Sequence, residues 1–352
     1  MDNYYVSGKS SAEGHQWTDA SIVTDNIEKN VRGWFRSYPH VQTDALVYSP
    51  TGFIWDNALR NDKSVRIYGE AAIPVFNDSL NWSSIYSGFQ NNEPFVFTNK
   101  TTIKPVEELL SPGYPGYDHH AIADVIRAKA FIDELKVYEE MEGDQWPELM
   151  LVALPNDHTA GTRPGYPTPR AMVADNDLAL GQIVEAISKS RFWESTVIFV
   201  TEDDSQAGWD HVSAYRTLGM VISPYSQAQT LESTQYNQTS MIRTIEQILG
   251  LPPMNILDAT AMPMFDCFVS APDNATYEAL PNRIPLDEMN PELSALSGKA
   301  LFYAKKSMNP EFSHVDRGND QLLNRIIWYA MRGKESYPKA FSDGEEDDDD
   351  DD

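Results

Sequence analysis

The sequence predicts an α/β fold built around a mostly parallel sheet, and three features support this prediction. Two short apolar runs, at 148–154 and 195–201, indicate buried strands. Between them, apolar side chains recur at helical spacing over residues 170–190. A strand, a helix and a second strand form the βαβ unit from which parallel sheets are assembled.

The pattern continues beyond the second strand. Residues 218–223 form another short apolar run, which predicts a further strand of the same sheet. A helical pattern with one apolar face follows this strand. The predicted helix ends at Gly250, and glycine is typical of helix C-termini. This apolar face consists of Met241, Ile242, Ile245, Ile248 and Leu249. Consecutive strands of one sheet would bring the segments that follow them to a common edge, where open α/β sheets keep their functional sites.

Two regions flank this unit within one expected domain of residues 1–340. The stretch 34–118 is rich in aromatic, Asn, Ser and Pro residues, and we interpret it as an insertion or cap over the site. Four of its side chains are candidates for a substrate pocket: Trp55, Arg66, Tyr68 and Glu70. Core packing is the commoner role for Trp55 and Tyr68. The amphipathic stretch 322–331 predicts a closing helix packed on the body.

An acidic cluster directly follows each of the first two predicted strands. The first is LPNDHTAG at 154–161, and the second is TEDDSQAGWDHV at 201–212. Aspartate oxygens and neutral histidine nitrogens are ligands for divalent metals, whereas a bare group of carboxylates would repel itself. The ordinary alternative for any single residue is a solvated loop acid. Two clusters at matching strand ends favour a metal site.

These motifs carry a family resemblance. Both clusters, the following RTLGMVISPY at 216–225 and the N-terminal DNYYVSGKSSAEGHQWT resemble the phosphoesterase family. This family includes phospholipase C-like and acid phosphatase-like enzymes of the alkaline phosphatase superfamily, and the chain looks closest to bacterial members often fused to a β-propeller. The resemblance covers most of residues 2–250. It implies an alkaline phosphatase-like three-layer sandwich that hydrolyses phosphate esters with divalent metals (Zn, Mn, Mg or Ca).

The resemblance also implies roles for individual residues. Asp203 and Asp204 match an adjacent pair that holds one metal ion. The ligands implied for the other metal are Asp157, His158 and His211. Ser11 lies where family members carry the nucleophile, with Ser10 as the alternative, although a serine in such a turn is often only a turn residue. Either His15 or His211 would assist proton transfer.

Two departures from the family pattern bear on activity. Tyr215 stands where relatives usually have a second histidine, and a neutral tyrosine is a poor metal ligand. No residue can be assigned to an upstream strand that carries an acidic-Asn metal-binding pair in the family. We therefore keep two alternatives to a phosphoesterase: a non-catalytic metal- or ligand-binding relative, and a hydrolase of another ester such as a sulfate. Loss of that pair predicts nearer one bound metal than two, and weak activity.

Composition restricts the partners. The formal net charge is −26. Residues 345–352 are two Glu followed by six Asp, and we expect the acidic tail that contains them, residues 341–352, to be disordered. Without a basic stripe, nucleic acid is not an expected target, whereas a small-molecule phosphate ester is. The single Cys267 excludes an intrachain disulfide. No signal peptide and no membrane-spanning run are visible, so localisation stays unassigned, although family relatives are often periplasmic or secreted. Oligomeric state is also left open.

Overall fold

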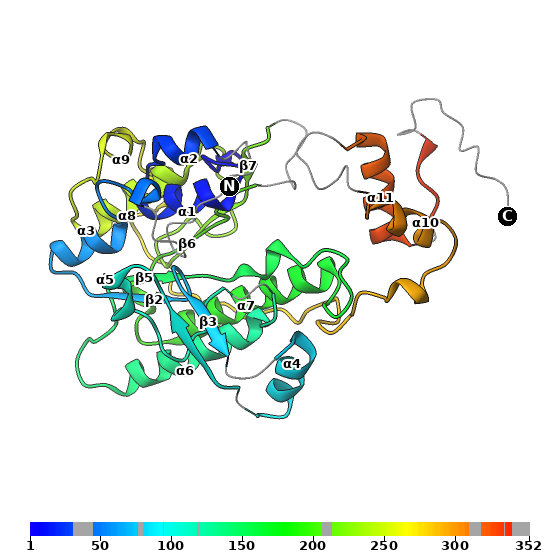
Figure 1. Ribbon diagram of the computed structural model, residues 1–352. Coiled ribbons are helices and arrows are strands. Elements are labelled where there is room, and N and C mark those ends of the chain that lie inside the picture. The colour runs from blue at the N-terminus through cyan, green and yellow to red at the C-terminus, as the bar shows by residue number, and fades with distance from the viewer. Residues whose placement is uncertain are drawn as a thin grey trace.

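The computed structural model describes residues 1–30, 45–76, 80–93, 95–117, 120–205, 213–309, 318–333 and 335–339. Helices and short strands are interspersed along the chain up to α8, and helices follow to its end, a mixture that fits an α/β protein (Figure 1). The helices are α1 (Ser11–Ala20), α2 (Asp25–Asn30), α3 (Ile54–Arg60), α4 (Trp82–Gln90), α5 (Lys104–Glu107), α6 (Asp124–Glu140), α7 (Pro169–Lys189), α8 (Gln238–Leu249), α9 (Ile256–Thr260), α10 (Gly298–Lys306) and α11 (Asp320–Arg332). The acidic tail and the start of the predicted insertion lie outside the described residues.

The strands are short and pair in small sheets. They are β1 (Tyr4–Tyr5), β2 (Val65–Tyr68), β3 (Ile73–Phe76), β4 (Phe97–Lys100), β5 (Leu149–Val152), β6 (Ile198–Thr201), β7 (Arg216–Thr217), β8 (Gly219–Ile222) and β9 (Tyr236–Asn237). β2 and β5 are parallel, whereas β6 pairs with β8 and β3 with β4 in antiparallel fashion. β1 lies between β7 and β9. The strands expected from the sequence are therefore present, as β5, β6 and β8.

Among the described residues, the large, mostly parallel central sheet predicted from the sequence is not observed, and only small sheets are present. β5 and β6 belong to different two-stranded sheets, and β8 runs antiparallel to β6. Parallel neighbours need a crossover connection, usually a helix. The described part of the connection between β6 and β8 contains no helix, so the chain turns back and pairs in the opposite direction.

The β2–β5 and β6–β8 pairs nevertheless share the same helical layers. On one face, Met150 of β5 and Ile198 of β6 both pack into the core formed by α6 and α7. On the other face, two apolar clusters meet at Ile245 of α8. Leu151 of β5 packs against one of these clusters and Phe199 of β6 packs against the other. Figure 1 shows α6 and α7 on one side of these strands and α1, α3 and α8 on the other. This arrangement directs the C-terminal ends of β2, β5 and β6 toward α1.

The helices behind the strands begin and end as the sequence indicates. Thr168 caps α7 by accepting the Ala171 N–H, and Pro169 occupies the first turn, where its missing N–H costs nothing. α8 ends at Gly250, whose φ of 71° is the left-handed conformation that glycine adopts most easily. The buried face of α7 contributes about 1.5–3 kcal/mol for each large apolar side chain removed from water.

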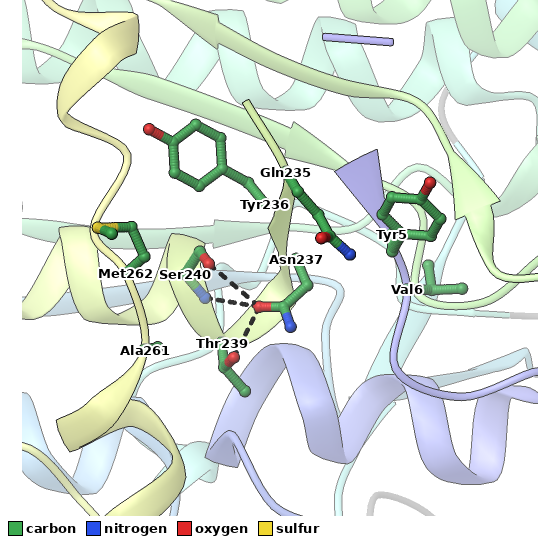
Figure 2. Close-up of a pocket in the computed structure, with 9 residues that line it drawn as sticks. All are labelled: Tyr5, Val6, Gln235, Tyr236, Asn237, Thr239, Ser240, Ala261 and Met262. Atoms are coloured by element: carbon green, nitrogen blue, oxygen red, sulfur yellow. Dashed lines mark hydrogen bonds between the residues drawn. The ribbon is translucent and has the colours of Figure 1, made fainter. Parts of the chain in front are cut away.

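A pocket of about 260 Å³ lies beside β1, β9 and the start of α8 (Figure 2). Its wall includes Asn237, whose side-chain oxygen accepts hydrogen bonds from the Thr239 hydroxyl (2.6 Å) and the Ser240 N–H (3.0 Å). None of the predicted site residues lines this pocket. We interpret this pocket as a space beside the capped N-terminus of α8. The cap fixes this end of the helix against β1.

The predicted closing helix corresponds to α11, but its apolar partners are on α10. The rings of Tyr303 and Tyr329 stack with centroids 4.7 Å apart, and Ile326 completes this small cluster. Figure 1 shows the pair away from the strands. The sequence predicted that this helix packs on the body, but in the structure α11 pairs with α10 instead. Among the described residues, no helix has both the length and the apolar character needed to cross a membrane.

Candidate metal and nucleophile site

The two acidic clusters and the N-terminal serine motif meet at the ends of the strands. Ser11 is the first residue of α1, and its hydroxyl donates a hydrogen bond to Asp204 Oδ2 at 2.9 Å. Asp204 follows β6 and is buried. The neighbouring Ser10 is also buried, and its hydroxyl makes no hydrogen bond to any part of the chain that the structure describes. Ser11 is thus the serine that faces the acidic cluster.

A close backbone approach holds α1 against the segment after β6. A Cβ atom added to Gly14 would lie 2.3 Å from the carbonyl oxygen of Asp203, so no larger residue fits without displacing the helix. The same carbonyl accepts a hydrogen bond from Gln238 Nε2 at 2.7 Å, while Gln238 Oε1 accepts one from the Ser7 N–H at 2.8 Å. The position of Asp203 relative to Ser11 is therefore fixed from two sides.

His15 links the ends of β2 and β6. Its Nδ1 lies 2.9 Å from Glu70 Oε1, just past β2, and its Nε2 lies 3.4 Å from Asp203 Oδ2. Burial lowers the pKa of His15, but the carboxylates of Glu70 and Asp203 outweigh burial and raise this pKa well above its usual value. Donor atoms of His15, Asp19 and Glu70 all lie within 4.8 Å of one another.

Asp157 joins this group from β5. It sits in a short 3₁₀ turn, Pro155–His158, directly after that strand. Loss of hydration, followed by the negative charges of Asp203 and Glu202, raises the pKa of Asp157 to about 6. The Asp157 side chain is nevertheless exposed, so solvent screens part of this effect. We call Glu70, Asp157, Asp203 and Asp204 the acidic edge.

His158 lies at the rim of the acidic edge beside a histidine that the sequence analysis did not select. The rings of His158 and His120 are stacked, with centroids 5.0 Å apart. His120 is buried and has a φ of 74°, a left-handed conformation that is uncommon for a residue other than glycine. The only sequence signal for this residue is its place in the DHH run before α6. Tertiary contact alone brings it to the predicted ligand.

Two other predicted positions behave differently. His211 lies outside the described residues, so its predicted role as a ligand stays a prediction. Tyr215 is placed at the start of β7, where its carbonyl oxygen accepts a hydrogen bond from the Val6 N–H (2.9 Å) and its ring lies 5.5 Å from Lys9 Nζ.

Among the candidate pocket residues, Trp55 and Tyr68 are fully buried in the core, Arg66 pairs with Glu134, and Glu70 faces His15.

Among the described residues, the donor atoms close enough together to share one cation belong to His15, Asp19 and Glu70, whereas the predicted ligands Asp157, Asp203 and Asp204 do not form such a group. Burial and then the negative charge of Asp203 raise the pKa of Asp157, and the imidazole of His15 faces the carboxylates of Glu70 and Asp203. Asp203 Oδ2 is buried and accepts no hydrogen bond from any described residue, with His15 Nε2 as an ion-pair neighbour. Oxygen-rich sites with one or two imidazoles suit Mg²⁺, Mn²⁺, Ca²⁺ or Zn²⁺.

Comparison with known families supports the resemblance. The Phosphoesterase family model matches residues 166–252, a segment that includes α7, β6, β8 and α8 together with Asp203 and Asp204. No curated protein matches the chain. The resemblance to the phosphoesterase family is thus confirmed over this segment, and the match indicates a hydrolase that acts on phosphate esters.

Proposed function

We propose that this protein hydrolyses a phosphate ester in a metal-dependent reaction with Ser11 as the nucleophile. The observation that carries the proposal is the 2.9 Å hydrogen bond from Ser11 to Asp204, because Asp204 lies within the matched phosphoesterase segment. A serine hydroxyl is a weak nucleophile unless a neighbouring group accepts its proton or a metal binds its oxygen. The acidic edge provides for both.

The metal would be held by Asp203, Asp204 and Asp157, with His158 and His211 as further ligands implied by the family resemblance. When bound, a divalent ion would lower the pKa of the serine hydroxyl and stabilise negative charge on the phosphoryl oxygens. Asp204 orients Ser11 Oγ and accepts its proton. The first-turn N–H groups of α1 favour binding of the anionic phosphate beside Ser11.

The covalent steps can be written with the residues of the chain. Ser11 Oγ forms a bond to phosphorus while the bond from phosphorus to the leaving oxygen breaks. His15, held by Glu70 at Nδ1, donates a proton to the leaving alcohol, and a water molecule then hydrolyses the phosphoserine and restores the hydroxyl. The acidic character of the chain favours small-molecule esters over nucleic acid as substrates.

A specific observation favours a second candidate, a non-catalytic metal- or ligand-binding relative. β5 and β6, which carry the two acidic clusters, are not hydrogen-bonded to each other. A site whose ligands come from separate two-stranded sheets has weaker support for a second metal than a site at the edge of one continuous sheet. In that case the protein would bind about one metal and turn over substrate slowly or not at all.

Metal analysis and hydrolysis assays separate these candidates. The purified protein, loaded with Mn²⁺, is assayed with p-nitrophenyl phosphate, bis-p-nitrophenyl phosphate and p-nitrophenyl sulfate. We expect phosphate-ester turnover that Ser11→Ala abolishes and Ser10→Ala retains, with metal content unchanged in both variants. Stoichiometric metal without turnover would support the non-catalytic relative, and turnover of the sulfate alone would support the other ester hydrolase. Equal activity of Ser11→Ala and the wild type would exclude Ser11 as the nucleophile.

A further inference from the structure

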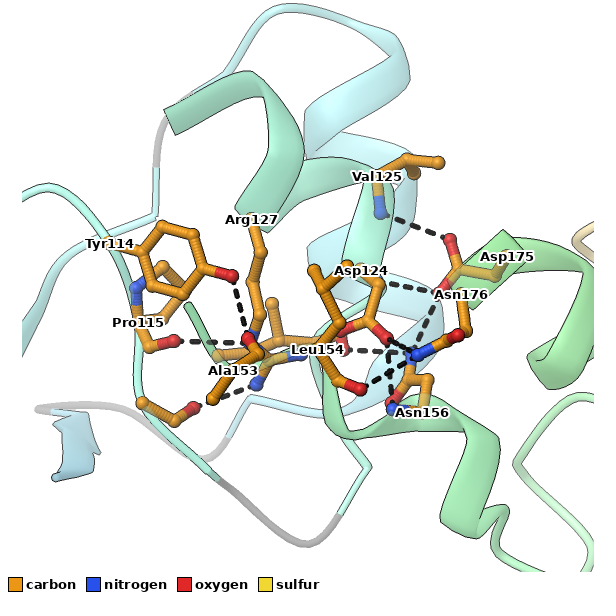
Figure 3. A network of polar contacts seen from close by, with 12 residues as sticks. Tyr114, Pro115, Asp124, Val125, Arg127, Ala153, Leu154, Asn156, Asp175 and Asn176 are labelled. Carbon is orange, nitrogen blue, oxygen red and sulfur yellow. Dashed lines mark hydrogen bonds and ion pairs between the residues drawn. The ribbon is translucent and has the colours of Figure 1, made fainter. Parts of the chain in front are cut away.

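A buried polar network surrounds Asn156 (Figure 3), which belongs to the same turn as Asp157 and His158. Asp124 and Arg127 are 0% exposed, Asn156 is 1% exposed and Asp175 is 3% exposed. Asn176, next to Asp175 on α7, completes it. Charged groups at this depth are normally paired and hydrogen-bonded, and the direction in which these bonds run indicates what the network holds in place.

Arg127 binds the loop that contains His120. Its guanidinium donates to the carbonyl oxygens of Pro115 (3.1 Å), Gly116 (2.7 Å) and Ile122 (2.8 Å). The same group pairs with Asp124 Oδ1 at 2.9 Å. The planar fork of Arg suits such multiple contacts, and they fix both ends of the segment that precedes α6.

Asp124 and Asn176 bind the exit of β5. Asp124 Oδ2 accepts the main-chain N–H of Asn156 at 2.9 Å and the side-chain amide of Asn176 at 3.1 Å. The amide of Asn176 also donates to the carbonyl oxygen of Leu154 at 2.7 Å. Leu154 and Asn156 enclose Pro155 immediately before Asp157, so two main-chain groups next to the predicted ligand are held by this pair of side chains.

Asp175 joins both loops to the start of α6. Its carboxylate accepts the Asn156 side-chain amide at 2.7 Å and the main-chain N–H groups of Asp124 (2.6 Å) and Val125 (3.1 Å). These N–H groups belong to the first turn of α6, where no preceding residue can accept them. The carboxylate therefore caps α6 from a neighbouring helix and orients Asn156 at the same time.

We propose that Asn176 and Asp124 are positioning residues, which set the Asp157–His158 turn against the His120 loop and thereby determine the affinity of the acidic edge for metal. The metal part of this inference rests on the proposed function. Replacing a buried ion network by apolar residues is often neutral for stability, so stability alone does not account for it. Its bonds converge on main-chain groups beside the predicted ligands, and residues that orient ligands typically change metal affinity 10- to 100-fold when replaced.

The test uses Asn176→Ala, because this variant keeps the Asp124–Arg127 ion pair and should fold. The matched control is Asn57→Ala. Asn57 is buried, whereas Asn176 is half-buried, and the Asn57 side-chain amide donates to the carbonyl oxygen of Pro252 at 2.8 Å, outside the network. Mn²⁺ affinity is measured by calorimetry, kcat and KM by steady-state assay, and exchange of the Asn156 N–H by NMR.

We expect Asn176→Ala to weaken Mn²⁺ binding about 10-fold or more, to lower kcat more than it raises KM, and to accelerate exchange of the Asn156 N–H. It should also shift the ring resonances of His120 and His158. Asn57→Ala should change none of these properties even where its loss of thermal stability is similar. An Mn²⁺ affinity that responds equally to both substitutions, or to neither, would overturn the inference.

The proposed function can fail separately. If the wild-type protein binds no Mn²⁺, the metal site is wrong, and the positioning of the turn is judged from the NMR readouts alone. Unchanged Asn156 exchange and unchanged His120 and His158 resonances in Asn176→Ala would then contradict the positioning role as well. Changes in these signals that Asn57→Ala does not produce would leave the positioning of the turn supported without a metal.

Discussion

The acidic edge and the buried network beside it contain the same kinds of side chain, and burial raises carboxylate pKa values in both, to about 7 for Asp124 and about 6 for Asp157, but the two regions differ in the hydrogen bonds that their carboxylates accept. In the network, Asp124 and Asp175 face an arginine, two asparagine amides and main-chain N–H groups. In the acidic edge, Asp203 Oδ2 accepts no hydrogen bond from a described residue and has His15 Nε2 at 3.4 Å as its cationic neighbour, while Asp157 is exposed and has a raised pKa. Carboxylates with a full set of donors hold a structure together, whereas carboxylates without one are arranged for a cation or a proton.

A third pair of carboxylates, Glu246 and Asp258, is an example of compensation by a bound proton. Burial, together with the neighbouring charge of Asp258, raises the pKa of Glu246 to about 7, although Arg243 opposes this shift. Glu246 is fully buried in α8. Compensation by donors and by a proton therefore occurs in two places of the molecule, compensation by a metal is proposed for a third, and each can be removed on its own.

The largest expected effect is in the network. Asp124→Ala leaves the buried guanidinium of Arg127 without its carboxylate and should lower the free energy of unfolding by about 3–5 kcal/mol. Urea denaturation measures the change. Asp133→Ala is the control, because Asp133 pairs with Lys129 and Lys136 on the exposed side of the same helix and should cost less than about 1 kcal/mol. Equal losses in the two variants would contradict the distinction.

A pH series addresses the proton-compensated pair. The folded-state pKa of Glu246 is above that of the unfolded chain, so its contribution to stability is complete below about pH 4.5 and is lost as the pH rises through about 7. The loss is at most about 3 kcal/mol. Unfolding free energies measured from pH 4.5 to 8 should fall less steeply in Glu246→Gln than in the wild type. Parallel pH profiles would rule out a raised pKa at this position.

A glycine pair compares the helix at the site with the helix behind it. Gly14→Ala should lower the unfolding free energy by about 1–3 kcal/mol and reduce turnover, because the new methyl group would meet the Asp203 carbonyl. In Gly181→Ala the added Cβ lies at an ordinary distance of 3.5 Å from Ala279, and removing a helix-interior glycine should stabilise by about 0.5–1 kcal/mol. Thermal melts and assays of both variants measure this. A neutral Gly14→Ala would mean that α1 does not approach β6 this closely.

The smallest change in stability is expected at the acidic edge itself. Asp203→Asn relieves the repulsion with Asp157 but also removes the ion pair with His15, so without metal the unfolding free energy should change by less than about 1 kcal/mol in either direction. Mn²⁺ affinity should nevertheless fall at least about 10-fold. A destabilisation comparable to that of Asp124→Ala would show that Asp203 is a structural residue.

The sequence predicted those features that depend on local periodicity. The strands at β5, β6 and β8 and the helices α7 and α8 follow directly from apolar spacing, and so does the placement of acidic segments after strands. Sheet pairing could not be predicted in this way, because the direction of β8 and the separation of β5 from β6 depend on contacts far apart in the chain. The closing helix was wrongly placed for the same reason.

The partners of the site residues were harder to predict than the residues themselves. Ser11 and Asp204 are 193 positions apart in the chain, and Glu70 reaches His15 from a segment expected to form a cap. His120 and Asp124 have no spacing pattern that distinguishes them from surface residues. Polar side chains that act through tertiary hydrogen bonds leave no periodic signal, so only the folded chain identifies them.

Titration of the wild-type protein with Mn²⁺, followed by calorimetry and thermal melting, tests the acidic edge most directly. We expect nearer one bound ion per chain than two, and a rise in melting temperature, since an ion that binds only the folded state stabilises it by about 2.7 kcal/mol at a concentration 100 times its Kd. Asp203→Asn should lose both effects, and Asn57→Ala should retain them. Absence of binding at millimolar Mn²⁺, or binding that Asp203→Asn leaves unchanged, would contradict the assignment of the acidic edge as a metal site.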